Sequence, residues 1–201
     1  MTKLVLFVGT PGAGKSTLLE TTARKFKGDF KIVNLGDVLL DIARERFGIT
    51  DREKLGMLTN DDILIQRELA FKKIIEGKTD AIIDTHLTIK YGRRYVPGVT
   101  LAELEKIRIK AIIYVDATAE EIWKRRHKDP EKQHRRNIND TTGEIEEQRS
   151  INLAILSSCS IYLSIPIYII YNADGKVEEA STEIGKILEE HFDVREKQKG
   201  R

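Results

Sequence analysis

The sequence lacks the features that mark secreted and membrane proteins. It contains one cysteine, Cys159, so it cannot form an intramolecular disulfide. It has no apolar run of about 18 residues, which a membrane-spanning helix needs. It also has no signal-peptide pattern near its beginning, where a lysine precedes only the short run LVLFV. We therefore expect a cytoplasmic protein with no membrane partner.

An excess of charge of one sign is also lacking. The chain has 34 lysine and arginine residues against 32 aspartate and glutamate residues, for a formal net charge of +2. Proteins that bind nucleic acid regardless of sequence usually carry a strong basic field, so we expect no nucleic-acid partner. Any site for an anionic ligand must be built locally.

The length and composition predict a single domain with a short tail. A chain of 201 residues is long enough for one sizeable core, which we place in residues 1–192. Residues 193–201 (DVREKQKGR) are mostly charged and have nothing to bury, so we expect this tail to be disordered.

Short apolar runs alternate with stretches of helical pattern. The runs are too apolar to be half-exposed strands, which favours parallel strands buried on both faces. They cover residues 4–8, 31–35, 81–84, 111–115 and 167–171. Alternating strands and helices predict an α/β fold with a doubly wound sheet. Polar stretches at 48–62, 91–98 and 127–140 interrupt this pattern, and we expect them to be mobile insertions over a site.

The first apolar run leads directly into GTPGAGKST, which matches the phosphate-binding pattern G-x-x-x-x-G-K-[ST]. Glycines permit backbone conformations in which successive N–H groups point at phosphate oxygens, and the following helix adds the positive end of its dipole. An ordinary glycine-rich turn is the alternative, but the preceding strand and following helix favour a donor nucleotide. The expected nucleotide-binding residues are Gly9, Thr10, Pro11, Gly12, Ala13, Gly14, Lys15, Ser16 and Thr17.

A carboxylate at a strand end is expected to complete a Mg²⁺ site with Ser16. Ligands of an open parallel sheet bind beyond the carboxyl ends of its strands, where Asp84 follows an apolar run. Asp84 can then bind the waters of Mg²⁺ held by Ser16. Asp116 ends another run and competes for this role, but it lies two residues before Thr118, where helix-start chemistry also explains an aspartate. We favour Asp84.

The stretch IIDTHLTIK continues with polar residues that face the same edge. Thr85, His86, Thr88 and Lys90 are expected to line the acceptor side of the site. The alternative is that His86 and the threonines only satisfy backbone groups of a loop.

Arginines are expected to supply the remaining positive charge. Guanidinium groups that bind the transferring oxygens can raise the rate of phosphoryl transfer by about a thousandfold or more. Arg125 and Arg126 close a helix that Thr118 and Glu121 begin as a capping box. The expected catalytic residues are Lys15, Arg125, Arg135, Arg136 and Arg149.

The sequence resembles the archaeal-type adenylate kinases of the nucleoside monophosphate kinase group. The likeness covers nearly the whole chain, through LVLFVGTPGAGKST, VNLGDVLLDIA, IIDTHLTIK, YVPG and RRNINDTTGEIEEQRSINLA. The P-loop alone does not select this family, whereas IIDTHLTIK together with DTTGEIEEQRSIN does.

The resemblance implies a P-loop NTPase-type fold, with a five-stranded parallel sheet flanked by helices. It implies transfer between ATP and AMP that gives two ADP, with Mg²⁺, in a homo-oligomer that is a trimer. It also implies an acceptor-binding region around residues 36–65, which includes Gly36 and Asp37, and a short lid around residues 127–139.

The chain departs from the bacterial-type adenylate kinases in two places. Asp84 is followed by Thr-His-Leu-Thr where their motif has Gly-Phe-Pro-Arg, and Leu40 stands where their pattern has another arginine. Both contacts to the AMP phosphate must therefore be reassigned. The candidates are Lys90, Arg93 and Arg94, or Arg52 and Arg67.

Two other functions fit parts of the sequence. If Asp84 is a general base and not a metal ligand, a kinase acting on a small-molecule hydroxyl is expected. The basic residues between 124 and 136 are also compatible with a nucleotide-dependent RNA or ribosome assembly factor.

Overall fold

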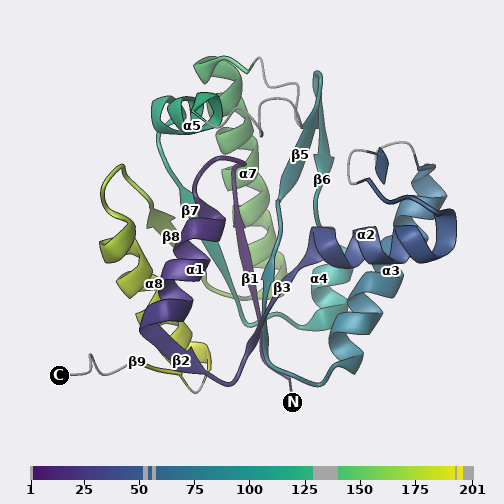
Figure 1. Ribbon diagram of the computed structural model, residues 1–201, viewed down its shortest axis with the longest axis horizontal. Helices are drawn as coiled ribbons and strands as arrows, with labels where there is room; N and C mark the ends of the chain where they lie inside the picture. Colours follow the sequence, from purple (N-terminus) through teal and green to yellow (C-terminus); the bar gives the residue numbers. More distant parts are fainter. Residues whose placement is uncertain (1, 52–53, 56–57, 129–139, 193, 197–201) are drawn as a thin grey trace.

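The computed structural model describes residues 2–51, 54–55, 58–128, 140–192 and 194–196 (Figure 1). Its strands are β1 (Leu4–Gly9), β2 (Phe26–Gly28), β3 (Lys31–Asn34), β4 (Ala81–Asp84), β5 (Thr88–Tyr91), β6 (Arg94–Pro97), β7 (Ala111–Asp116), β8 (Ile167–Tyr171) and β9 (Val194–Glu196). Its helices are α1 (Lys15–Lys25), α2 (Leu35–Phe47), α3 (Asn60–Glu76), α4 (Leu101–Ile107), α5 (Ala119–His127), α7 (Thr142–Leu163) and α8 (Val177–His191). No described helix is both long and apolar enough to cross a membrane.

Five strands form one parallel sheet in the order β3-β4-β1-β7-β8. The central strands β1, β4 and β7 are buried along their whole length, because helices cover both faces. The expected five-stranded parallel sheet flanked by helices is therefore confirmed. All five carboxyl ends meet at one edge, where Asp84 lies beside Phe7 in the register of β4 and β1.

Alternation along β1 divides the core into two layers. Val5 and Phe7 pack in one cluster with α1 and α8, whereas Leu4, Leu6 and Val8 pack in a second cluster with α2, α3, α4 and α7. Figure 1 shows the two groups of helices on opposite sides of the sheet. The capping box of Thr118 and Glu121 is present at the start of α5, and equivalent boxes begin α4 and α7.

Two segments differ from the sequence expectations. Residues 91–98 belong to an antiparallel hairpin of β5 and β6, which turns at Gly92 with a φ of 59°. Val194–Glu196, expected to be disordered, forms β9 and pairs with β2. The tail could pair because a strand ladder joins backbone groups and needs no apolar side chains. The lid prediction falls mainly on residues 129–139, which lie outside the described residues.

Candidate active site

The P-loop begins at the carboxyl end of β1 and ends in the first turn of α1. Gly12 and Gly14 have φ values of 90° and 91°, a region that glycine reaches readily. The N–H of Ala13 donates to the carbonyl of Thr10 at 3.0 Å and closes the turn. Ser16 and Thr17 are exposed at the start of α1, at the positive end of the helix dipole. This geometry suits an anion.

Lys15 lies beneath the loop and is only 8% exposed. Its ammonium group donates to the carbonyl of Gly9 at 3.3 Å and lies 3.1 Å from Nδ1 of His86. The same Nδ1 lies 3.3 Å from the carbonyl of Gly9, so it accepts from Lys15 in one tautomer and donates to Gly9 in the other. The structure thus brings together a predicted phosphate-binding lysine and a predicted acceptor-side histidine.

Asp84 and Asp116 have different surroundings. Oδ2 of Asp84 accepts a hydrogen bond from the side chain of Asn34 at 2.8 Å. Asp116 is held by Arg149, whose Nε and Nη2 donate to its two carboxylate oxygens at 2.8 and 2.7 Å. These hydrogen bonds raise the pKa of Arg149 above its ordinary value, against the opposing effect of burial. Asp116 is therefore bound to a guanidinium in this structure.

The residues present suit a magnesium ion. Ser16 lies at the start of α1, and Asp84 ends the strand next to β1. A hydroxyl and a carboxylate are the hard oxygen donors that Mg²⁺ prefers. Among the described residues there is no cluster of three or more His, Cys, Asp or Glu side chains, so a metal here would complete its shell with water and phosphate.

The other predicted acceptor-side residues are only partly brought together. Thr85 is partly exposed after β4, and its N–H donates to the carbonyl of Phe7. Gly36 and Asp37 lie in the first turn of α2, where the N–H of Asp37 donates to the side chain of Asn34. Thr88 is 2% exposed and hydrogen-bonded to helix α7, so the expectation that it lines the acceptor side is wrong in this structure.

Lys90 projects from the hairpin strand β5 toward the start of α7. Its ammonium donates to Asp140 at 2.7 Å and to Glu144 at 2.9 Å. Burial opposes its charge, but these two carboxylates raise the pKa of Lys90 above its ordinary value. The carboxylate of Glu144 accepts a hydrogen bond from the N–H of Thr141 and pairs with Lys90. These interactions lower the pKa of Glu144 to about 2.

The other candidates for the AMP phosphate are placed differently from one another. Arg67 is bound to Glu103 at 2.7 and 2.5 Å and to the carbonyl of Pro97 at 3.2 Å. Arg93 and Arg94 are exposed at the tip of the hairpin. Arg52 lies outside the described residues.

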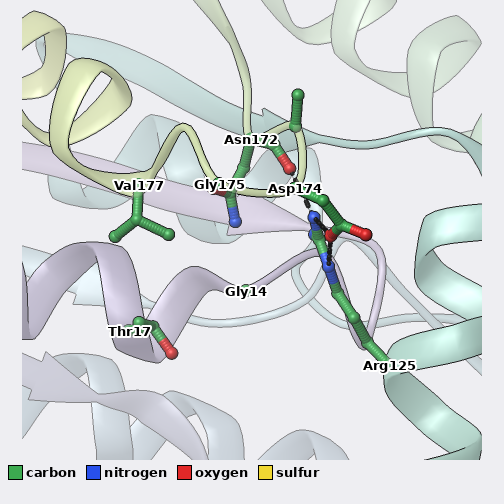
Figure 2. A pocket seen from close by; sticks show the side chains of 8 residues that line it. Gly14, Thr17, Arg125, Asn172, Asp174, Gly175 and Val177 are labelled. Carbon is green, nitrogen blue, oxygen red and sulfur yellow. Dashed lines mark hydrogen bonds and ion pairs between the residues drawn. The ribbon is translucent and has the colours of Figure 1, made fainter.

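Arg125 reaches from α5 across the P-loop to the loop after β8 (Figure 2). It donates to Asp174 at 3.0 and 2.6 Å, to the carbonyl of Asn172 at 2.8 Å and to that of Ala13 at 3.3 Å. A pocket beside it is lined by Gly14, Thr17, Arg125, Asn172, Ala173, Asp174, Gly175 and Val177. Arg135 and Arg136 lie outside the described residues.

Two side chains hold the P-loop: Arg126, which the sequence placed with Arg125 among the arginines expected around the donor, and Asn172, which sequence reasoning missed. Arg126 is 5% exposed and donates to the carbonyl of Pro11 through Nε at 2.9 Å and Nη2 at 2.7 Å, while Nη1 pairs with Asp140. The side chain of Asn172 donates to the carbonyl of Ala13 at 2.8 Å. Nothing in the sequence indicated that Arg126 would contact Pro11, and Asn172 had no signal beyond following an apolar run.

Comparisons with known proteins agree with this geometry. A protein-family model described as an AAA domain matches residues 8–146. A curated adenylate kinase of Thermoplasma acidophilum is 32% identical over 184 residues, which cover 91% of this chain and 97% of that protein. Adenylate kinases of Methanopyrus kandleri and Methanocaldococcus jannaschii are 32% and 31% identical, over 90% and 92% of this chain and 94% and 98% of their own.

Solved structures share the fold at much lower identity. A shikimate kinase from Acinetobacter baumannii, in complex with shikimate, has a TM-score of 0.57 and 14% identity over 94% of both chains. A putative kinase from Chloroflexus aurantiacus has a TM-score of 0.58 and 16% identity over 96% of this chain and all of its own. At such identities the likeness shows the fold alone.

Proposed function

Since the chain matches the AAA-domain family model over residues 8–146 and belongs to the adenylate kinases, we propose that it transfers a phosphoryl group reversibly from ATP to AMP, giving two ADP. The observation that supports this most is the arrangement at the sheet edge. The P-loop and Lys15 stand at the end of β1, and Thr85 and His86 follow the neighbouring strand β4. A donor phosphate and an acceptor phosphate can therefore meet across two adjacent strand ends.

The donor side is formed by the loop and the pocket next to it. Backbone N–H groups of Gly12 to Thr17 and the ammonium of Lys15 would bind the phosphates of ATP. The pocket that Gly14, Thr17 and Arg125 line would take the nucleoside part. Arg125 and Arg149 would supply positive charge, and so would Arg135 and Arg136 of the proposed lid.

Magnesium is part of the proposal. Ser16 and Asp84 would hold it, directly or through water, and a bound Mg²⁺ would neutralise charge on the phosphate oxygens. Asp84 is then a metal-binding residue and not a general base.

The acceptor needs positioning more than activation. A phosphate oxygen of AMP is already anionic at neutral pH, so no base has to remove a proton. The proposed acceptor region covers residues 36–65, with Gly36 and Asp37 in α2 and with Thr85, His86 and Lys90 on its other side. Because Lys90 contacts Asp140 and Glu144, it would have to exchange a carboxylate for the AMP phosphate.

Several finer features stay predictions from the sequence. They are a single domain over residues 1–192, a lid around residues 127–139, a trimer and a cytoplasmic location. Light scattering of the purified chain tests the oligomeric state, because it distinguishes a trimer from a monomer.

The proposed function is tested by mixing the protein with Mg·ATP and each nucleoside monophosphate in turn, and separating the products by chromatography. We expect rapid ADP formation with AMP and much less product with the others. Shikimate and a sugar in the same panel test the hydroxyl-kinase alternative, and a salt-dependent shift with RNA tests the assembly-factor alternative. No turnover with any monophosphate would overturn the proposal.

A further inference from the structure

A chain of hydrogen bonds between buried side chains joins the P-loop to strand β5. Its members are Thr10 of the P-loop, Thr88 of β5, Tyr114 of β7, and Gln148 and Asn152 of α7. None of them is more than 2% exposed. Both α7 residues come from the stretch DTTGEIEEQRSIN, in which the proposed phosphate site accounts for Arg149 but not for Gln148 or Asn152.

Three hydrogen bonds along this chain have a defined donor and acceptor. Gln148 donates from Nε2 to the hydroxyl of Thr88 at 3.3 Å. That hydroxyl donates to Oδ1 of Asn152 at 2.7 Å. Asn152 in turn donates from Nδ2 to the hydroxyl of Thr10 at 3.2 Å, and the phenol of Tyr114 lies 3.2 Å from the same hydroxyl.

Asn152 is the centre of this chain because its amide both accepts and donates. Its oxygen accepts from Thr88 of β5 and its nitrogen donates to Thr10 of the P-loop. One side chain therefore sets the distance between the two elements. Apolar side chains of similar volume would fill the same space, but they would not fix one orientation as directional hydrogen bonds do.

Both ends of the chain lie close to reacting groups. The carbonyl of Thr10 accepts the N–H of Ala13, so the position of Thr10 sets the turn that presents the phosphate-binding amides. At the other end, Thr88 is two residues beyond His86, which contacts Lys15. A shift of Thr88 against Thr10 would therefore displace acceptor-side residues relative to the donor loop.

We propose that Asn152 is a positioning residue, which aligns the P-loop with strand β5 and the acceptor-side residues next to it for phosphoryl transfer. The inference rests on the proposed function. A displacement of about 1 Å between reacting groups can lower a rate by about a hundredfold, even where each substrate still binds. Loss of the Asn152 amide should therefore act on turnover more than on binding.

The first test is Asn152→Ala, with kcat and the KM values for ATP and AMP measured separately. We expect kcat to fall by at least about tenfold while either KM changes by less than about threefold. Leu156→Ala is the matched control, because Leu156 is also buried on α7 and has an apolar side chain. It should lower the melting temperature without this loss of kcat.

A second position keeps the test independent of how well Asn152→Ala folds. Thr88→Val removes the hydroxyl with little change in shape and should also lower kcat, whereas Thr88→Ser keeps the hydroxyl and should recover at least half of the lost kcat. The double variant Asn152→Ala/Thr88→Val should be no slower than Asn152→Ala alone, since both changes break one chain.

The outcomes separate this inference from the proposed function. If the unaltered protein does not convert ATP and AMP, the proposed function is overturned and the inference with it. If it does, and Asn152→Ala and Thr88→Val lower only the melting temperature, the inference alone is overturned. If Asn152→Ala does not fold, an unchanged kcat in Thr88→Val overturns it equally.

Discussion

Arg149 of helix α7 binds Asp116 at the end of strand β7 through two hydrogen bonds, of 2.8 Å from Nε and 2.7 Å from Nη2. The side chain of Asp116 is 2% exposed and that of Arg149 is 15% exposed. A buried carboxylate needs such a partner, because an isolated charge in the protein interior is strongly unfavourable. The pair explains why an aspartate ends β7, and it leaves Asp84 as the better candidate for the metal.

Arg149→Ala should lower the free energy of unfolding by about 3–5 kcal/mol, because Asp116 would stay buried without its guanidinium. Chemical denaturation measures this loss. Adding Asp116→Asn should restore part of the stability by removing the charge. If Arg149 also binds the transferring phosphate, the double variant should keep a kcat at least about tenfold below that of the original protein. Full activity in the double variant would show that Arg149 acts only through Asp116.

Lys15→Ala should lower kcat/KM for ATP by at least about a hundredfold, because the ammonium supplies charge to the outer phosphates. The melting temperature should change little. The variant loses hydrogen bonds to Gly9 and His86, but it no longer buries a charged group. Steady-state kinetics and a thermal melt test the two expectations. Lys27→Ala, an exposed change on β2 at the other end of the sheet, is the control. A large drop in the melt would mean that Lys15 is chiefly structural.

The fold could be predicted because its signals are local. A strand, a glycine-rich turn and a helix follow one another within the first 25 residues, and each buried strand is a short apolar run. The capping residues of α5 were also predicted, since a capping box is read from residues three apart.

The partners of the charged residues could not be predicted in the same way. Arg126 and Pro11 are 115 positions apart, and Arg67 and Glu103 are 36 apart. Neighbouring arginines in the sequence are chemically alike, so only the fold decides that Arg125 reaches Asp174 whereas Arg126 lies on the P-loop. Lys90 was predicted at an acceptor site, but the two carboxylates that it contacts, those of Asp140 and Glu144, lie at the start of α7.

Arg126→Lys should raise the KM for ATP by about tenfold. The guanidinium places two donors on the carbonyl of Pro11 and a third on Asp140, and an ammonium cannot reproduce this fork. The P-loop would then be less well held before ATP binds. Lys124→Ala is the control, because Lys124 is exposed on the same helix. An unchanged KM in Arg126→Lys would show that the charge alone is sufficient.

Gly14→Ala should abolish ATP binding and destabilise the protein. A Cβ at Gly14 would lie well within 3.0 Å of the side chain of Asn172, in addition to the strain of a φ of 91°. Gly92→Ala isolates the strain, since Gly92 also has a positive φ but nothing lies within 4 Å of the added atom. We expect Gly92→Ala to lose about 1 kcal/mol of stability and to bind an ATP analogue normally in calorimetry. Equal effects of the two changes would contradict the proposed crowding at Gly14.

The pair of Arg67 and Glu103 should make stability depend on pH in the acid range. Burial alone would raise the pKa of Glu103, but hydrogen bonds from Arg67 and Thr100 outweigh it and hold the pKa below its ordinary value of 4.5. A carboxyl whose pKa is lowered by folding stabilises the protein fully above its ordinary pKa, and this contribution is lost as pH falls through the lowered value. Glu103→Gln should therefore be less stable than the original protein at neutral pH, by about 2–4 kcal/mol. The difference should shrink as the pH falls below 4.5.

Urea denaturation at several pH values measures this difference in the free energy of unfolding. Glu105→Gln is the control, because Glu105 is exposed on the same helix. A difference that is constant with pH would mean that the charge on Glu103 contributes nothing to stability.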